Sequence, residues 1–330
     1  MHDVIAAVLL LAATLAGETT ATPSVPVAPV PVAPVPVVRT IKIPGKQIPT
    51  EISQHAGALW FVSWNNWPKL EPFLGRISVK GTIRLNEIMN GSMPGLSTRA
   101  ADGTLWLTDR QRGALWHVLT SGQIARIKTD RPTLGIAAGP DGTLWTTHPG
   151  SSTITSYGTD GKMRSRWEVP ALKAVASRPN WIVAGADGAL WFSDAATDRV
   201  GRITTAGAVT LYPLPKGWKD PGEIIATNDG FWFTVGNQSV LGRMNLQGGI
   251  KPVKILAPAR AVARGPEQRI WYTNGERTIG WINADGTSDY VLVAEENGGV
   301  RSLAAGPDGS MWFVDEKART VGRVELPQAP

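Results

Sequence analysis

The stretch "GADGALWFSDAATDRVGRITTAGAVTLYPLP" (Gly185–Pro215) contains most of a unit that recurs along the chain. Its Asp-Gly pair stands between the apolar runs "WIVAGA" and "LWFS", and such a pair is the strongest short signal for a β-hairpin. Two further apolar segments, "VGRIT" and "AVTLYPLP", follow after polar turns. The unit therefore predicts four short antiparallel strands.

Seven copies of this unit follow one another, each marked by one tryptophan just after the turn. Successive tryptophans lie 39 to 46 residues apart, and no segment has the pattern of a long amphipathic helix. Repeats of this period indicate a solenoid or a propeller, and four strands per repeat favour a propeller blade. These framework tryptophans are Trp60, Trp106, Trp145, Trp191, Trp232, Trp271 and Trp312.

The two ends of the repeat region predict how the ring closes. The last unit stops after its third strand, "TVGRVELP" (Thr320–Pro327). "RTIKIPGKQIP" (Arg39–Pro49) resembles a fourth strand with no unit before it. We expect this N-terminal strand to complete the last blade, since closure removes exposed sheet edges. The predicted fold is an all-β, seven-bladed β-propeller over residues 39–330, with four antiparallel strands per blade.

The tryptophans fall into two groups with different expected roles. One framework indole per blade should pack between adjacent blades and bury a large area. The remaining seven lie off the framework position and are better candidates for contacts with a ligand: Trp64, Trp67, Trp116, Trp167, Trp181, Trp218 and Trp281.

Residues 1–38 are expected to lie outside the propeller. Val4–Ala16 is an apolar run shorter than a bilayer span, and small residues follow it, so residues 1–21 are predicted to be a signal peptide. Its first residues include no Lys or Arg, which leaves an uncleaved anchor open. Residues 22–38 are rich in proline and predict an extended linker. We expect a secreted or periplasmic protein with no membrane span after signal cleavage.

Composition limits the chemistry and the partners. The 330 residues include no cysteine, which excludes disulfides, thiolate nucleophiles and thiolate metal sites. The formal net charge of +6 suits an anionic partner, but the basic residues form no run. Ordinary solubility charge is therefore favoured over nucleic-acid binding, and we expect no nucleic-acid partner. We also expect a monomer.

The repeat resembles that of the streptogramin B lyase (virginiamycin B lyase) family of seven-bladed propellers, over about residues 39–327. The motif that carries the resemblance is "GPDGxLWF(T/S)x", followed by "(I/V)GRI" and "YPLP". The resemblance implies a carbon–oxygen lyase that opens cyclic depsipeptides by elimination, using Mg²⁺ and a general base. It places the key histidines where the inner strands of the last two blades begin, with two glutamates nearby.

This chain departs from the family pattern at those positions. Counted from the framework tryptophans, the histidine positions hold Arg260 and Arg301, and one glutamate position falls near Gly299. The other acid is retained as Asp315 or Glu316, which would then be a remnant of the site or a partner for Arg301. A guanidinium group stays protonated, so it is neither a general base nor a Mg²⁺ ligand. We therefore expect a binding or scaffold module. The alternative is a Mg²⁺-dependent lyase with a rearranged site, and Mg²⁺ is expected as a cofactor only there.

Two sets of loops should converge on the top face, around the mouth of the central channel. The sequence predicts ligand-binding residues there at Glu51, Arg178, Asn180, Trp181, Glu223, Arg260 and Arg301. One interpretation is a structural network of Arg–carboxylate pairs. The other is a site for a small anionic or polar ligand, or a protein partner, with planar Arg forks and a stacking indole.

Candidate catalytic residues on the same face are His148, Asp315 and Glu316. His148 would act with Asp109 or Asp194, although a lone loop histidine is more often incidental. A further alternative is a lactonase-type hydrolase with a channel-bound Ca²⁺, for which Glu51, Asn180 and Glu223 would supply oxygens. Of the other histidines, His117 is expected to be structural and His55 to be exposed in a turn.

Overall fold

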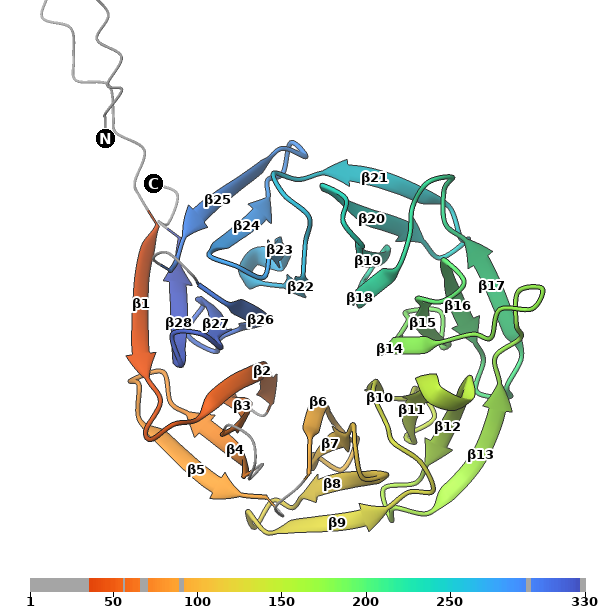
Figure 1. The fold of residues 1–330 in the computed structure, drawn as a ribbon, viewed down its shortest axis with the longest axis horizontal. Helices are drawn as coiled ribbons and strands as arrows, with labels where there is room; N and C mark the ends of the chain where they lie inside the picture. The colour runs from red at the N-terminus through yellow and green to blue at the C-terminus, as the bar shows by residue number, and fades with distance from the viewer. Residues whose placement is uncertain (1–35, 56, 66–70, 89–91, 295–297, 327–330) are drawn as a thin grey trace, which may run out of the picture. The chain divides into compact units, whose positions relative to one another are not determined.

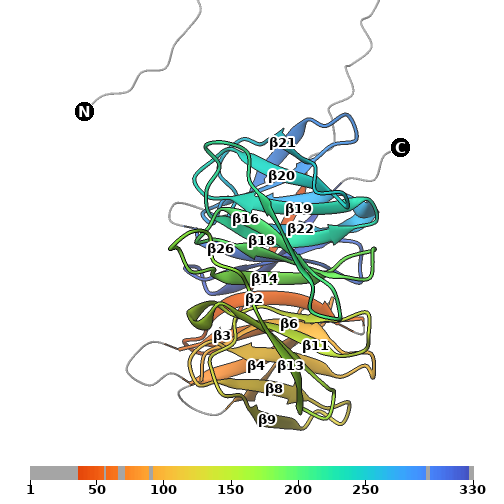
Figure 2. The same cartoon turned by 90° about the vertical axis from the view of Figure 1, so that its right-hand side faces the viewer.

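The computed structural model describes residues 36–55, 57–65, 71–88, 92–294 and 298–326. These residues form seven four-stranded antiparallel sheets arranged as a ring (Figure 1). In side view the ring is a disc whose thickness is less than its diameter (Figure 2). The predicted seven-bladed propeller is confirmed. The predicted signal peptide (1–21) and the linker up to residue 35 lie outside the described residues.

In blades one to six the strands follow chain order from the centre of the ring outward, and in blade seven the N-terminal strand takes the outermost place (Figure 1). Blade one contains β2 (Ile48–His55), β3 (Ala58–Trp64), β4 (Pro72–Ile77) and β5 (Ile83–Glu87). Blade two contains β6 (Pro94–Arg99), β7 (Leu105–Asp109), β8 (Ala114–Val118) and β9 (Ile124–Lys128). Blade three contains β10 (Ile136–Ala138), β11 (Leu144–His148), β12 (Thr153–Tyr157) and β13 (Met163–Glu168). Blade four contains β14 (Pro179–Ala184), β15 (Leu190–Asp194), β16 (Arg199–Ile203) and β17 (Val209–Pro213). Blade five contains β18 (Pro221–Thr227), β19 (Gly230–Val235), β20 (Val240–Asn245) and β21 (Ile250–Lys254). Blade six contains β22 (Ala261–Arg264), β23 (Ile270–Thr273), β24 (Thr278–Ile282) and β25 (Ser288–Leu292). Blade seven contains β26 (Val300–Ala305), β27 (Met311–Asp315), β28 (Thr320–Glu325) and β1 (Val37–Lys42).

The described residues contain only two short 3-10 helices besides these strands, η1 (Pro149–Ser151) and η2 (Pro266–Gln268). Neither these helices nor any other described segment offers a helix of the length and apolarity that a bilayer crossing needs.

The ring closes through the first strand, as the sequence predicts. β1 pairs antiparallel with β28, from Val37 opposite Glu325 to Lys42 opposite Thr320. The stretch 39–49, predicted as one fourth strand, in fact contains two elements. β1 ends at Lys42, a turn with Gly45 at φ 74° follows, and Ile48 begins the inner strand of blade one. The prediction of a single strand was therefore wrong at its C-terminal half.

The repeated Asp-Gly turn is fixed to the framework tryptophan that follows it. In blade seven Asp308 Oδ1 accepts a hydrogen bond of 2.9 Å from Trp312 Nε1. Arg323 of β28 donates to Asp308 Oδ2 at 3.0 Å, and its guanidinium lies 5.6 Å from the centre of the Trp312 ring. Blade four repeats the set with Asp187, Trp191 and Arg202. The motif therefore ties the hairpin turn, the second strand and the third strand together.

Each framework indole packs against the next blade, as expected. Trp145 of blade three lies in one apolar cluster with Ile182 and Phe192 of blade four, and Trp312 of blade seven joins Phe61 of blade one. In blades one, four, five and seven, the phenylalanine after the framework tryptophan packs on the glycine of the third strand. A Cβ at Gly322, for example, would lie 2.2 Å from the Phe313 ring.

The off-framework tryptophans have less uniform roles than predicted. Trp116 and Trp281 are buried in blade cores, and Trp167 stacks on Trp145 with ring centroids 4.7 Å apart. These three are structural, which corrects the expectation of ligand contacts. Trp181 lies at the channel mouth, and Trp67 falls outside the described residues.

Candidate functional site at the channel mouth

Irregular inner strands bring side chains to the channel mouth. Five inner strands, β2, β6, β14, β18 and β26, shift register near their first residues. In β14 the shift leaves Trp181 outside the ladder, in β18 it leaves Glu223, and in β26 it leaves Arg301. A β-bulge turns side chains away from the regular alternation. The same local irregularity in successive blades thus presents polar groups around one opening.

A cavity of about 430 Å³ lies at this mouth. This volume falls in the range of small-molecule sites. Five predicted ligand-binding residues line the cavity together with Arg110, which the sequence analysis missed: Glu51, Trp181, Glu223, Arg260 and Arg301. We call this space the channel-mouth cavity.

Two predicted ligand-binding residues, Arg178 and Asn180, are not part of its lining. The Arg178 guanidinium lies 3.6 Å from Asp220 in an exposed pair. The backbone carbonyl of Asn180 accepts a hydrogen bond from Thr147 Oγ1. The structure therefore does not bring these two side chains together with the other five.

Two ion pairs organise the mouth. Arg301 Nη1 lies 2.7 Å from Glu316 Oε2, so the expected partnership of these two residues is confirmed. Arg110 Nη2 lies 2.9 Å from Glu51 Oε1. All four side chains are at most 29% exposed, so solvent screens these pairs less than it screens surface pairs. Part of the predicted Arg–carboxylate network is therefore present.

Glu223 and Arg260 differ from these pairs. Glu223 Oε2 accepts a hydrogen bond of 3.2 Å from the Val262 backbone N–H. Burial raises the pKa of Glu223 well above its usual value, and the nearby Glu51 carboxylate raises it further. Arg260 has no ion-pair partner among the residues the structure describes. The mouth thus combines an uncompensated guanidinium with a carboxyl group that favours its neutral form.

Burial also raises the pKa of Glu51, and the Arg110 charge and its hydrogen bond oppose that effect. Two buried carboxyl groups in one cavity, with only one held in an ion pair, disfavour simultaneous ionisation. The Arg260 charge lowers the pKa of Glu223, but its effect is smaller than those of burial, the Glu51 charge and the Val262 hydrogen bond.

Asp315 has a structural task in the loop after β27. Its side chain is buried, and Oδ1 accepts hydrogen bonds from the backbone N–H groups of Gly299, Lys317 and Ala318 at 2.9 to 3.0 Å. Asp109 makes the same kind of contacts in blade two. Asp315 lies outside the lining of the channel-mouth cavity.

His148 is buried in blade three, away from the other catalytic candidates. Its Nδ1 lies 3.0 Å from the Pro132 carbonyl oxygen and its Nε2 lies 3.0 Å from Thr146 Oγ1. Burial lowers the pKa of His148 to about 4. Because a carbonyl only accepts, Nδ1 carries the proton and Nε2 accepts from the threonine. The structure therefore does not gather His148, Asp315 and Glu316 in one cavity.

The remaining described histidines are structural. His117 stacks on Trp106 with ring centroids 4.0 Å apart, as its place in the repeat predicts. His55 is half-buried rather than exposed, since its Nε2 lies 3.1 Å from Ser97 Oγ and burial lowers its pKa to about 4. The prediction of exposure was wrong because β2 extends through His55.

The donor set at the mouth does not fit Mg²⁺ or Ca²⁺. The described residues include no group of three His, Cys, Asp or Glu side chains placed to hold a metal ion. Glu51 and Glu316 give oxygens to guanidinium groups, and only two of the three residues proposed for Ca²⁺ line the cavity. Hard cations need several free oxygens. No chemical step is therefore derived through a metal here.

Arg110 was missed although the repeat contains a signal for it. It follows Asp109 directly in "LWLTDRQ", just as Glu316 follows Asp315 in "MWFVDE". Both residues stand four places after a framework tryptophan and both form ion pairs at the mouth. Comparing this position in all blades would have found Arg110.

The comparisons with known proteins agree with this geometry. Residues 126–328 match the sequence model of the virginiamycin B lyase family. A virginiamycin B lyase from Nocardia farcinica (strain IFM 10152) is 27% identical over 194 residues, which cover 58% of this chain and 65% of that protein. The matched region is thus less than two thirds of that relative's length.

Two solved structures have the same fold. A streptogramin B lyase is 24% identical, with a TM-score of 0.80 over 88% of this chain and 98% of that chain. A catalytically inactive virginiamycin B lyase from Staphylococcus aureus, solved with quinupristin, is 25% identical, with a TM-score of 0.79 over 89% of this chain and 100% of that chain. Together with the match to the sequence model, they show that this chain belongs to the virginiamycin B lyase family.

Proposed function

We propose that this chain is a binding module that holds a small anionic or polar molecule in the channel-mouth cavity. The observation that carries the proposal is Arg260, which lines the cavity without an ion-pair partner among the described residues. A guanidinium fork binds carboxylate or phosphate in a bidentate manner. The beginning of an inner strand thus holds a fixed cation, and the cavity around it is large enough for a ligand.

The neighbours of Arg260 support an anion. Glu223 favours its neutral form, so it donates a hydrogen bond to a ligand oxygen instead of repelling it. Trp181 lines the same cavity and offers a flat surface for an apolar or aromatic part of the ligand. Arg110 and Arg301 add positive potential, although each is paired with a carboxylate.

A second candidate is a carbon–oxygen lyase, as the relatives are named. Glu223 is the observation that favours it, because a buried carboxylate of raised pKa is a better proton acceptor than an exposed one. In an elimination it would take the proton from the carbon next to a carbonyl, and the carbon–oxygen bond one carbon further would break to release a carboxylate. Arg260 and Arg301 stand where the family resemblance implies histidines, which weighs against this candidate.

Thermal shift and calorimetry with citrate and phosphate test the binding proposal. We expect stabilisation by at least one anion and its loss in Arg260→Ala and Arg301→Ala. Arg243→Ala serves as the matched control, because Arg243 and its ion-pair partner Asp229 both lie outside the cavity lining. Anion binding that is unchanged in both cavity variants would contradict the proposal.

Linearisation of quinupristin, with and without Mg²⁺, tests the lyase candidate. The S. aureus structure was solved with this compound. We expect no turnover in either condition. If the protein linearises quinupristin and the Glu223→Gln variant does not, the function is that of a lyase and the binding-module proposal is wrong.

Export is a separate part of the proposal. The apolar run Val4–Ala16 and the proline-rich segment behind it support a secreted or periplasmic protein that acts as a monomer. The mass of the intact protein, measured after expression in a host that exports proteins, tests whether the signal peptide is removed. A mature chain that begins near residue 22 is expected, and an intact cytoplasmic chain would contradict export.

A further inference from the structure

A second cavity, of about 560 Å³, lies between the β9–β10 loop and the 3-10 helix η1. It shares only Arg110 and Leu134 with the channel-mouth cavity. Its other lining residues come from two short segments, 130–133 and 148–151. We call it the blade-three cleft. Its volume also falls in the range of small-molecule sites.

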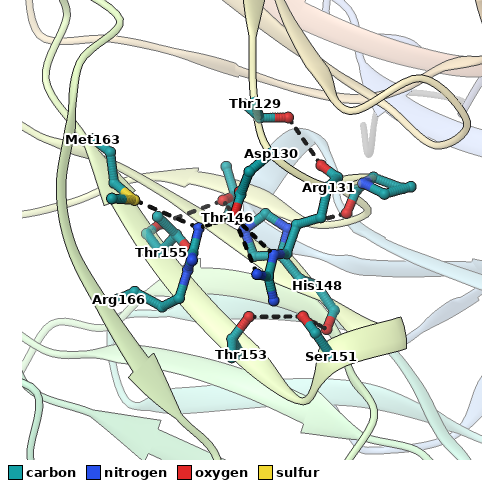
Figure 3. Close-up of polar contacts among 11 residues, drawn as sticks. Thr129, Asp130, Arg131, Thr146, His148, Ser151, Thr153, Thr155, Met163 and Arg166 are labelled. Carbon is teal, nitrogen blue, oxygen red and sulfur yellow. Dashed lines mark hydrogen bonds and ion pairs between the residues drawn. The ribbon is translucent and has the colours of Figure 1, made fainter.

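The charges around the cleft leave one cation in excess. Asp130 Oδ2 accepts from Arg131 Nη2 at 3.1 Å and from Arg166 Nη2 at 2.6 Å (Figure 3). Burial raises the pKa of Asp130, but the hydrogen bonds from the two arginines outweigh burial and lower it. Asp130 therefore stays ionised. Arg110 pairs with Glu51, so the connected charges are three arginines, at 110, 131 and 166, against two carboxylates.

Both lining arginines keep N–H groups for a further partner. Arg131 uses Nε and Nη2 on Asp130, and its side chain is 31% exposed. The Arg110 side chain has one hydrogen-bond partner among the described residues, Glu51, and is 24% exposed. Since a guanidinium group has five N–H donors, each arginine is able to bind a carboxylate without losing its present contact.

The rest of the cleft wall is apolar or already satisfied. Pro132, Leu134 and Pro149 provide aliphatic surface. Burial lowers the pKa of His148 to about 4, and both of its ring nitrogens have partners, so it offers neither charge nor a free hydrogen bond. Ser151 Oγ lies 2.9 Å from Thr153 Oγ1 (Figure 3). A ligand body would therefore meet mainly apolar surface.

We propose that the blade-three cleft is a second ligand site that takes a monocarboxylate with a compact apolar body. The carboxylate is bound by the guanidinium groups of Arg131 and Arg110, and the body packs against Pro132, Leu134 and Pro149. This site shares Arg110 with the channel mouth, but it needs neither Arg260 nor Glu223, on which the proposed function rests. Its chemistry follows from one surplus cation next to an apolar wall.

The test compares benzoate with benzamide, which has nearly the same shape but no charge. Each is titrated up to about 10 mM and followed by NMR shifts of the backbone amides of residues 131, 133, 134, 148, 150 and 151, in a range where weak ligands bind measurably. We expect saturable shifts with benzoate and at least about tenfold weaker binding of benzamide. Arg131→Gln should weaken benzoate binding about tenfold, by loss of a charge-assisted hydrogen bond.

A blocking variant and a matched control locate the site. A Cβ at Gly150 would meet no atom within 4 Å, so Gly150→Phe is able to fill the cleft without a backbone clash. Benzoate binding should disappear in this variant while the melting temperature stays unchanged. Arg260→Gln changes the other cavity and should leave benzoate shifts in the cleft as they are.

Three results would overturn the proposal: no saturable binding of benzoate, equal binding of benzamide, or benzoate shifts that persist in both Gly150→Phe and Arg131→Gln. Loss of the shifts in Arg260→Gln would assign benzoate to the channel mouth and overturn it as well. If Gly150→Phe fails to fold, the benzamide comparison and Arg131→Gln still decide. An anion at the channel mouth would leave the amides of residues 148, 150 and 151 unshifted, which separates the two sites.

Discussion

At the scale of single residues, neighbours decide what an ionisable group does in this protein. Asp315 and Glu316 are adjacent in sequence, yet one clamps three backbone N–H groups and the other pairs with Arg301. Among the described residues, no cation is in hydrogen-bond contact with Glu223, and desolvation raises the pKa of this half-buried carboxyl group. A carboxyl group in this state makes stability depend on pH.

Glu223→Gln should therefore stabilise the protein increasingly as pH rises. Above pH 4.5 the unfolded chain ionises this glutamate, whereas the folded protein keeps the proton to a higher pH because the folded pKa is raised. The stability that Glu223 contributes is complete below the unfolded value and is lost as pH rises through the folded one. The amide keeps an oxygen that accepts from the Val262 N–H.

Chemical denaturation at a series of pH values measures this effect as the variant minus the parent free energy of unfolding. Glu316→Gln is a useful comparison, because it removes a carboxylate that is ion-paired with Arg301. A Glu223→Gln difference that is flat or falls with pH would show that the buried carboxyl is not strained when ionised.

At the scale of secondary-structure elements, most of the blade could be predicted from the sequence. Framework tryptophans occur in all seven repeats, and Asp-Gly turns and third-strand glycines occur in most of them. They favour the same hairpins along the chain, because each residue type fits one local packing position. The register shifts in the inner strands could not be predicted. A bulge depends on how backbone groups pair between neighbouring strands of one blade. Both "PNWIVA" and "PGEIIAT" begin with the proline at which the register shifts, but a proline does not fix how many residues the shift leaves unpaired.

The unpredicted register shifts also limited how many site residues could be placed from the sequence. Five of seven ligand-binding candidates line the channel-mouth cavity because the loops were placed correctly. Arg178 and Asn180 were misplaced by one or two residues, since a bulge changes which side chain enters the channel. The burial of His148 was also hidden, because it depends on the Pro132 carbonyl of a neighbouring loop.

Gly322→Ala tests the contact between a strand glycine and the preceding phenylalanine. The added Cβ would lie 2.2 Å from Phe313, a buried ring with no room to move, so the free energy of unfolding should fall by about 1 to 3 kcal/mol. Gly150→Ala is the matched control, since its Cβ would meet no atom within 4 Å. Equal stability of the two variants in urea would contradict this account of the "GRI" glycine.

At the scale of the whole molecule, stability depends on joining the two ends of the described chain. β1 contributes six residues that pair with β28, and without them blade seven has three strands. Deletion of residues 1–42 should lower the free energy of unfolding by several kcal/mol and leave the β28 edge open to intermolecular pairing. Light scattering and thermal denaturation would show a lower melting temperature and larger species.

A variant that lacks only residues 1–35 is the control, because it keeps every β1–β28 pair. The two deletions differ by seven residues, so a large difference between them isolates ring closure. If the two variants have the same melting temperature and both stay monomeric, the closing strand contributes little to the stability of the protein.

Ring closure also has a consequence for synthesis. β1 is among the first strands to be made, but its only partner, β28, is among the last. A growing or truncated chain that lacks β28 therefore leaves β1 unpaired, whatever the state of the middle blades. The pairing of Val37–Lys42 with Thr320–Glu325 forms only in a chain that has been synthesised through β28. A premature stop anywhere before Thr320 therefore leaves a β1 edge that chaperones and proteases recognise.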